Sequence, residues 1–238
     1  ALIDKPDLLG LYVIFEPDGL DGADAGFVGQ AALGSNETGR FALYWVQSKP
    51  GELQAVIGDE GLLANTEPGP SGAPYNAFYT CARDTRQACV LEPYFDEASG
   101  SRKLVTSVAF PLLENGKVIA VVGLDINLAA LQQNSEASAR ELFDGNGQIS
   151  IVSPRGVISA NSQDVSRPGQ PMDNAEVLDS LRQGQPKVVV DAQQIKVLEP
   201  LAHHFARVPG PVGDPALHVH EVRQRGVDVE DVAELGGV

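Results

Sequence analysis

Two apolar runs joined by an Asn-Gly pair constrain the fold of this chain more than any other feature of its sequence. Residues 104–113 and 117–125 are rich in Val, Ile and Leu, as β-strands are. The pair Asn115-Gly116 between them is typical of a tight hairpin turn, because both positions tolerate a positive φ. The segment therefore predicts an antiparallel hairpin that forms half of a small sheet.

An aspartate lies at the boundary of a predicted strand in two places. Asp96 follows Tyr94 by two positions, and Asp125 ends the second run of the hairpin. A small organic cation needs carboxylates to accept its N–H donors and aromatic faces to attract its charge. The two aspartates offer such carboxylates, and Tyr94, Phe78 and Tyr79 offer such faces. We therefore interpret these five side chains as a candidate cation site.

Each aspartate also has an ordinary structural interpretation. Asp96 opens the segment Asp-Glu-Ala-Ser-Gly, where aspartate is a common turn residue. Asp125 precedes residues 126–133, which have helix-like spacing, so that Asp125 or Asn127 would be a good helix N-cap. Residue types alone leave both interpretations open.

Acidic side chains outnumber basic ones, which excludes some partners. The 238 residues carry 32 Asp and Glu against 17 Lys and Arg, a formal net charge of −15. A surface this acidic repels nucleic acid and anionic membranes, so neither is expected as a partner. No apolar run of roughly 18 residues and no signal peptide is visible, and the sequence opens at Ala1 without Met, so we expect a fragment of a longer protein.

The sequence contains no motif that indicates catalysis. Neither a Gly-x-Ser-x-Gly elbow nor a Gly-rich phosphate loop followed by Lys is present. The pairs His203-His204 and His218-x-His220 lack a carboxylate at a spacing characteristic of a metal site. We expect no enzyme activity, no cofactor and no metal.

The two cysteines, Cys81 and Cys89, lie in one polar segment. No histidine lies near them and there is no second cysteine pair, so a zinc site is not expected. Their short spacing allows a disulfide. Such a bond would indicate an oxidising, extracytoplasmic compartment.

The pattern of strands and helices occurs twice along the chain. Twelve of the fourteen aromatic residues precede residue 111, so the second half lacks the aromatic content of the first. Two mixed units of strands and helices are therefore predicted, 1–143 and 144–238. The elements expected before the hairpin are a strand or helix end at 8–15 and strands at 39–47 and 53–57. After it we expect a helix at 175–182 and strands at 148–152, 156–160, 187–190 and 194–198.

Four motifs in order resemble the double-Cache sensor domains of bacterial chemoreceptors. They are the segments 39–45, 92–96, 104–112 and 118–126, and the likeness extends over roughly residues 8–200. Within that family the chain is most similar to amine-sensing members, including those for polyamines and histamine. The resemblance implies an α+β fold of two PAS-like (Cache) subdomains, each an antiparallel sheet flanked by helices, with the family's long N-terminal helix truncated here. Residues 1–143 would be the membrane-distal, ligand-binding subdomain and 144–238 the membrane-proximal one, of which 203–238 is atypical.

The resemblance also implies roles for individual residues. Amino-acid sensors of this family carry an Arg-x-Trp-Tyr element for the ligand carboxylate and backbone, and a Tyr-x-Asp with a later Asp for the ammonium. Here the second set is intact as Tyr94, Asp96 and Asp125.

The first element departs from the family pattern. It reads Asn76-Ala-Phe78-Tyr79, so Asn76 stands where the arginine would be. Without a guanidinium, a zwitterion would leave its carboxylate unpaired, so an amine is favoured over an amino acid. Trp45 or its neighbour Tyr44 would add a further wall, because strand alternation lets one of the two face a given side.

We therefore predict the periplasmic or extracellular sensor portion of an inner-membrane chemoreceptor that binds a small cationic amine such as putrescine or histamine. The full-length receptor would be a homodimer attached to the membrane through flanking segments. One alternative is an amino-acid-sensing Cache domain of a chemoreceptor or sensor kinase. Two others are a domain that binds a partner protein and, last, an enzyme.

Overall fold

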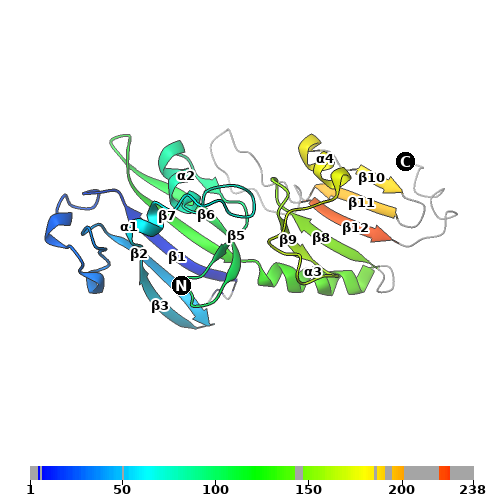
Figure 1. Ribbon diagram of the computed structural model, residues 1–238, viewed down its shortest axis with the longest axis horizontal. Helices are drawn as coiled ribbons and strands as arrows, with labels where there is room; N and C mark the ends of the chain where they lie inside the picture. The colour runs from blue at the N-terminus through cyan, green and yellow to red at the C-terminus, as the bar shows by residue number, and fades with distance from the viewer. Residues whose placement is uncertain are drawn as a thin grey trace. The chain divides into compact units, whose positions relative to one another are not determined.

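The computed structural model describes residues 5, 7–49, 51–142, 147–184, 187–190, 195–200 and 220–225. The chain divides into two compact units, Ala1–Ala129 and Ala130–Val238, called unit 1 and unit 2 below. Each contains one antiparallel sheet (Figure 1). The two-subdomain α+β fold expected from the sequence is confirmed. The functional division at 143/144 stays a prediction.

Unit 1 is built on a seven-stranded sheet in which the first strand of the unit pairs with the last. The order along the sheet is β3-β2-β1-β7-β6-β4, and β5 also pairs with β6. Two short helices, α1 (Glu60–Leu63) and α2 (Ala77–Thr85), complete the unit (Figure 1). The strands are β1 (Leu8–Phe15), β2 (Ala42–Lys49), β3 (Glu52–Ile57), β4 (Cys89–Val90), β5 (Tyr94–Asp96), β6 (Lys103–Glu114) and β7 (Lys117–Asn127).

The hairpin predicted from the Asn-Gly pair is formed by β6 and β7. Its turn has φ 50° at Asn115 and 78° at Gly116, the left-handed values that such a turn requires. The helix expected to start directly after Asp125 begins later. The strand continues to Asn127, and α3 (Ala129–Glu141) starts two residues after it.

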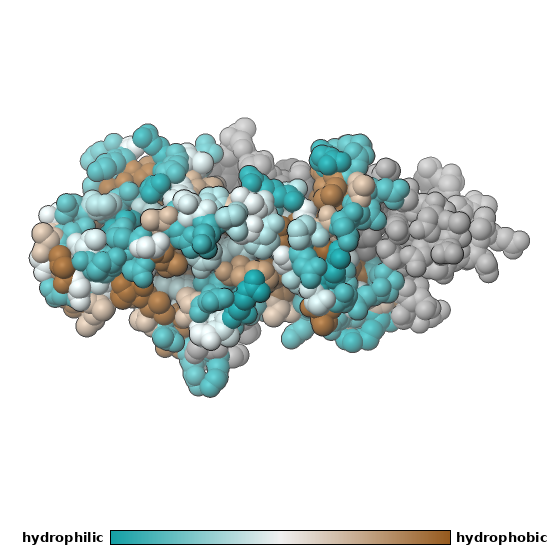
Figure 2. Space-filling view, viewed as in Figure 1, coloured by the Kyte–Doolittle hydropathy of each residue, from teal (hydrophilic) through white to brown (hydrophobic). Residues whose placement is uncertain are grey.

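One face of the unit 1 sheet carries the core. Along β1 the residues Gly10, Tyr12 and Ile14 are buried, whereas the alternating Leu11 and Val13 are partly exposed. Helix α2 packs against β6 and β7. On the surface, hydrophobic residues are interspersed with hydrophilic ones over unit 1 (Figure 2), and the exposed hydrophobic side chains include Phe110, Leu112 and Leu113 on β6.

Unit 2 repeats the central strand arrangement with fewer strands. Its sheet has the order β10-β11-β12-β8-β9, so again the first strand, β8, pairs with the last, β12. The predicted hairpin of β8 and β9, helix α4 and the pair of β10 and β11 are confirmed. The elements are β8 (Gln148–Val152), β9 (Ile158–Asn161), α4 (Ala175–Gln183), β10 (Lys187–Val190), β11 (Ile195–Pro200) and β12 (His220–Arg225).

Strand β12 lies within residues 203–238, which the sequence marks as atypical. No strand is predicted from the sequence in this region, yet β12 occupies an interior position between β11 and β8. His203, His204 and His218 lie outside the described residues. None of the helices in the described ranges combines the length and apolar character needed to cross a membrane.

Candidate ligand-binding site

Asp125 is a buried strand residue, not a helix cap. It lies on β7, in register with Gly10 of β1 on one side and Ser107 of β6 on the other, and is 3% exposed. Its Oδ1 accepts hydrogen bonds from the Ser107 hydroxyl and, at 3.3 Å, from the Tyr94 hydroxyl. Asn127, two residues before the start of α3, accepts from the Ala129 amide at 3.0 Å through its Oδ1. The N-cap interpretation of Asp125 is therefore wrong, and that of Asn127 stays a prediction, because its bond is to the first residue of the helix and not to the second or third.

Asp96 ends β5 and is also buried, at 6% exposure. Its Oδ1 accepts from the Ala98 amide at 3.3 Å, so the turn interpretation holds for one of its hydrogen bonds. A turn aspartate is ordinarily exposed, however, because burial penalises its charge. Among the described residues, no Lys or Arg forms an ion pair with Asp96 or Asp125.

Burial of two carboxylates in one region shifts their titration. Burial and then the charge of Asp125 raise the pKa of Asp96 to about 7, against the smaller opposing effects of backbone amides and Lys103. Burial also raises the pKa of Asp125, although the hydroxyls of Ser107, Tyr44 and Tyr94 act in the opposite direction. The pair therefore resists carrying two negative charges near neutral pH while no cation is bound.

Tyr44 reaches this pair across a neighbouring strand. It lies on β2, and a Cβ added to Gly10 of β1 would come within 2.1 Å of its Cε2 atom. The missing side chain at Gly10 thus lets the ring cross β1 toward Asp125. The Tyr44 hydroxyl is buried and has no hydrogen-bond partner that satisfies normal geometry. Burial, the charges of Asp125 and Asp96, and hydrogen bonding toward the Asp125 carboxylate raise the pKa of Tyr44.

Tyr44, and not Trp45, is the β2 residue that the structure brings to the acidic pair. The strand is regular here, with Tyr44 opposite Tyr12 and Trp45 opposite Leu11. Successive side chains of a strand point to opposite faces, so Trp45 belongs to the face away from the core. The isolated Gly10 in an apolar run was a usable signal for Tyr44, because such a glycine often marks a close approach.

Aromatic side chains form a continuous series around the two aspartates. The ring of Tyr12 lies over Gly123, where a Cβ would approach it to 2.0 Å. Ring centroids along the series are 5.5–6.3 Å apart and meet edge to face, which is a favourable aromatic geometry. The members in order are Tyr44, Tyr12, Phe78, Tyr75 and Tyr94.

Tyr75 was not predicted as a site residue, although the structure places it between Phe78 and Tyr94. Burial and the charges of Asp96 and Asp125 raise the pKa of Tyr75, so its hydroxyl interacts electrostatically with the acidic pair. Tyr75, Phe78 and Tyr94 line a cavity of about 20 Å³ together with residues of the 69–74 loop. Neither aspartate lines this cavity, which holds roughly one water molecule.

Two predicted site residues on or beside α2 are engaged elsewhere. The Asn76 side-chain amide donates to the Leu63 carbonyl at 2.9 Å. The Tyr79 hydroxyl donates to Glu16 and accepts from Arg40, and Arg40 also forms an ion pair with Glu60. These contacts connect α2 to the ends of β1 and β2 and are separate from the acidic pair.

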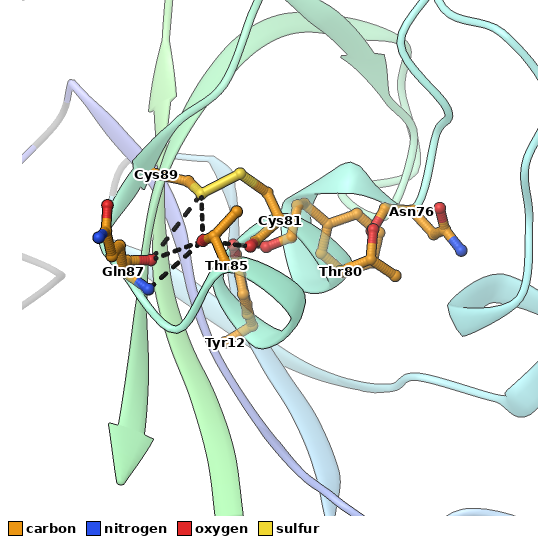
Figure 3. The surroundings of a disulfide bond; sticks show 8 residues. Tyr12, Asn76, Thr80, Cys81, Thr85, Gln87 and Cys89 are labelled. Carbon is orange, nitrogen blue, oxygen red and sulfur yellow. Dashed lines mark hydrogen bonds between the residues drawn. A yellow bond between two sulfur atoms is a disulfide. The ribbon is translucent and has the colours of Figure 1, made fainter. Parts of the chain in front are cut away.

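The predicted disulfide between Cys81 and Cys89 is formed (Figure 3). It joins the second half of α2 to β4, which pairs with β6. Thr85, one turn after Cys81, donates to the Cys81 carbonyl at 2.7 Å. The helix that carries Phe78 is thus covalently attached to the sheet that carries Asp125.

Comparisons with known proteins place these residues in a family of sensors. Residues 1–133 match the family described as methyl-accepting chemotaxis protein-like, first PDC sensor domain. The chain is 50% identical over 207 residues to the methyl-accepting chemotaxis protein TlpQ of Pseudomonas aeruginosa. That match covers 84% of this chain and 29% of TlpQ, so the chain spans less than a third of that relative.

Solved structures show the same fold at low sequence identity. Methyl-accepting chemotaxis protein X superposes with a TM-score of 0.70 and 22% identity, over 95% of this chain and 77% of that one. The periplasmic sensory domain of the Campylobacter jejuni chemoreceptor Tlp1 gives a TM-score of 0.65 and 11% identity, over 94% and 74%. At these identities the likeness extends to the fold alone.

Proposed function

This chain belongs to the family of methyl-accepting chemotaxis protein-like first PDC sensor domains, and from that premise we propose that its unit 1 binds a small cationic amine. The family is one of chemoreceptor sensor domains rather than enzymes, and the chain is the periplasmic sensor portion of a membrane chemoreceptor. The class of ligand is inferred from the residues of unit 1.

The observation that carries the proposal is a pair of buried carboxylates with which none of the described Lys or Arg side chains forms an ion pair. Asp96 and Asp125 are 6% and 3% exposed, burial raises the pKa of both, and the charge of Asp125 further raises that of Asp96. Burying an unpaired carboxylate is unfavourable, and this cost is removed when an ammonium enters between the two. A cationic ligand therefore has a larger interaction with this site than a neutral or anionic one.

The aromatic series supports the same ligand class. Tyr94 bonds to Asp125, the charges of both aspartates act on Tyr75, and Phe78 packs against Tyr75, so these rings present the apolar surface that an alkyl or imidazole group needs. Aromatic faces also attract a cation by their quadrupole. The cavity that these rings line is about 20 Å³, so a diamine would displace Tyr75 or the 69–74 loop on entry.

An amino acid fits these residues less well than an amine. A ligand carboxylate requires a guanidinium or ammonium, and the guanidinium groups of Arg40 and Arg83 lie over the Tyr79 ring. The Asn76 amide, which occupies the expected arginine position, already donates to a backbone carbonyl. A carboxylate would thus add a third negative charge near Asp96 and Asp125, where Lys103 is the described cation that already acts on Asp96.

Isothermal titration calorimetry on this chain tests the proposal. Putrescine and histamine should bind, whereas alanine and glutamate should give no saturable heat. Cadaverine and agmatine widen the amine series, and 1,4-butanediol is the uncharged control of matched length. Saturable binding of an amino acid, with no binding heat from any of the amines, would refute the amine assignment and favour an amino-acid sensor.

In the full-length receptor we propose that ligand binding in unit 1 is transmitted across the membrane by a homodimer. A ligand shifts a two-state equilibrium only through its differential affinity for the two states. In this proposal the aromatic series closes around the ammonium and Tyr75 moves, so the ligand contacts the closed state more extensively than the open one. The prediction that residues 1–143 are membrane-distal belongs to this proposal.

A further inference from the structure

Among the residues that the structure describes, the Tyr44 hydroxyl is the one buried side-chain polar atom that makes no hydrogen bond of normal geometry, although it lies close enough to Asp125 for hydrogen bonding between them to shift the pKa of both groups. Buried hydroxyls in folded proteins almost always have a partner, because an unmet hydrogen bond is costly. Two other buried hydroxyls at the site are paired: Tyr94 with Ser107 at 2.8 Å, and Tyr12 with the Phe78 carbonyl at 2.6 Å. A buried hydroxyl in a binding region that makes no regular hydrogen bond indicates that the ligand supplies the hydrogen-bonding partner.

The backbone around Tyr44 is arranged to place this hydroxyl beside the aspartates. Gly10 lies in register with Asp125 on β7, and its missing side chain is the space that the Tyr44 ring occupies. Any larger residue at Gly10 would meet the ring and its hydroxyl within 2.6 Å. The groups that face the Tyr44 hydroxyl from neighbouring elements are the carboxylates of Asp125 and Asp96 and the phenol of Tyr75.

These groups match the hydrogen-bonding capacity of one chemical group. A primary ammonium has three N–H donors and no acceptor. Asp125 and Asp96 each offer a carboxylate oxygen, and Tyr44 offers a phenolic oxygen whose own proton can turn toward a carboxylate. The three acceptors thus come from three strands, β7, β5 and β2.

We propose that Tyr44 is the third acceptor of the ammonium site and that it makes the site selective for an unsubstituted primary amine. This inference rests on the amine-binding function proposed above and deepens it. N-methylation replaces N–H donors by methyl groups, so a methylated ammonium leaves acceptors of the site unpaired. A quaternary ammonium keeps its charge and its attraction to the rings but loses all three hydrogen bonds.

A calorimetric comparison of three charged probes on two proteins tests this inference. The probes are putrescine, its N,N,N′,N′-tetramethyl derivative and the bis-trimethylammonium derivative, which hold the charge and chain length constant. The proteins are the wild type and Tyr44→Phe, which keeps the ring over Gly10 and removes the hydroxyl. Trp45→Phe, the next residue of the same strand, is the matched control, and thermal unfolding verifies that both variants fold.

In the wild type, putrescine should bind at least about 30-fold more tightly than the bis-quaternary probe. Tyr44→Phe should weaken putrescine about tenfold, the loss of one hydrogen bond to a charged group, and leave the bis-quaternary affinity unchanged. The ratio between the probes is the informative quantity, because a change in packing alone moves both affinities together.

Two results would overturn the inference while amine binding stands: equal affinity of the wild type for the three probes, or an unchanged affinity of Tyr44→Phe for putrescine. Failure of every probe to bind the wild type would instead refute the amine-binding function, and the role of Tyr44 with it.

Discussion

The two units share a strand order and differ in what they bury. In each, the first strand pairs with the last at the centre of the sheet. Unit 1 buries Asp96, Asp125 and Arg40. In the described part of unit 2, the buried polar side chains are neutral hydroxyls, those of Ser135, Ser153, Ser159 and Ser180.

This contrast separates the requirements of the fold from those of the ligand. A hydroxyl is satisfied by its own neighbourhood, as in Ser135, which donates to the Leu131 carbonyl at 2.8 Å. A buried carboxylate pair is not, and unit 1 keeps it at a cost to its own stability. Recognition is therefore expected to depend on side chains that are dispensable for the fold and confined to unit 1.

The sharpest test of the contrast replaces the central carboxylate. Asp125→Asn keeps the shape of the side chain and an acceptor for Ser107 and Tyr94, but removes the charge. We expect putrescine affinity to fall by at least about 100-fold, because the ligand cation loses a buried charged partner. The matched control is Asp164→Asn in unit 2, an exposed carboxylate that accepts from Ser166 at 2.6 Å. Equal losses in the two variants would contradict the assignment of the site to unit 1.

The second test uses pH. Binding of a cation requires Asp96 to be ionised, and its pKa is raised to about 7. Below that pH a proton must leave before the amine enters, so affinity should rise about tenfold per pH unit from pH 5 to 7 and then level off. Asp96→Asn should bind more weakly and with a shallower dependence. A flat profile in the wild type would show that Asp96 does not face the ligand.

The same carboxyl should also affect the stability of the empty domain. The pKa of Asp96 is higher in the folded state, at about 7, than in an unfolded chain, near 4. The folded protein therefore binds more protons between these values, and stability is lost as the pH rises through them. Asp96→Asn should be more stable than the wild type at pH 8, by a few kcal/mol, and equally stable at pH 4. Thermal unfolding at both pH values measures this difference.

The smallest expected effect on binding comes from the core of unit 2. Ile158 is fully buried against Val152, Val177 and Leu181, so Ile158→Ala should destabilise unit 2 by about 3 kcal/mol. The calorimetric affinity of unit 1 for putrescine should not change at temperatures where unit 2 stays folded. A loss of putrescine affinity in Ile158→Ala at those temperatures would show that both units take part in ligand recognition. It would contradict the expectation that recognition is confined to unit 1.

Local sequence signals predicted the parts of the fold that depend on local chemistry. The hairpin of β6 and β7 followed from an Asn-Gly pair whose left-handed backbone few other residues adopt. The disulfide followed from two cysteines in one short segment. Strand β12 could not be predicted in the same way, because its position between β11 and β8 depends on long-range pairing.

The sequence by itself determined the strand pattern of both units and the presence of a carboxylate pair among aromatic residues. Tertiary structure decided which of these groups meet. It buried Asp125 inside a strand, turned Tyr44 rather than Trp45 toward it across Gly10, and directed Tyr79 to Arg40 and Glu16. The physical reason is that strand alternation and a single missing side chain fix directions in space, and residue type or spacing along the chain cannot reveal them.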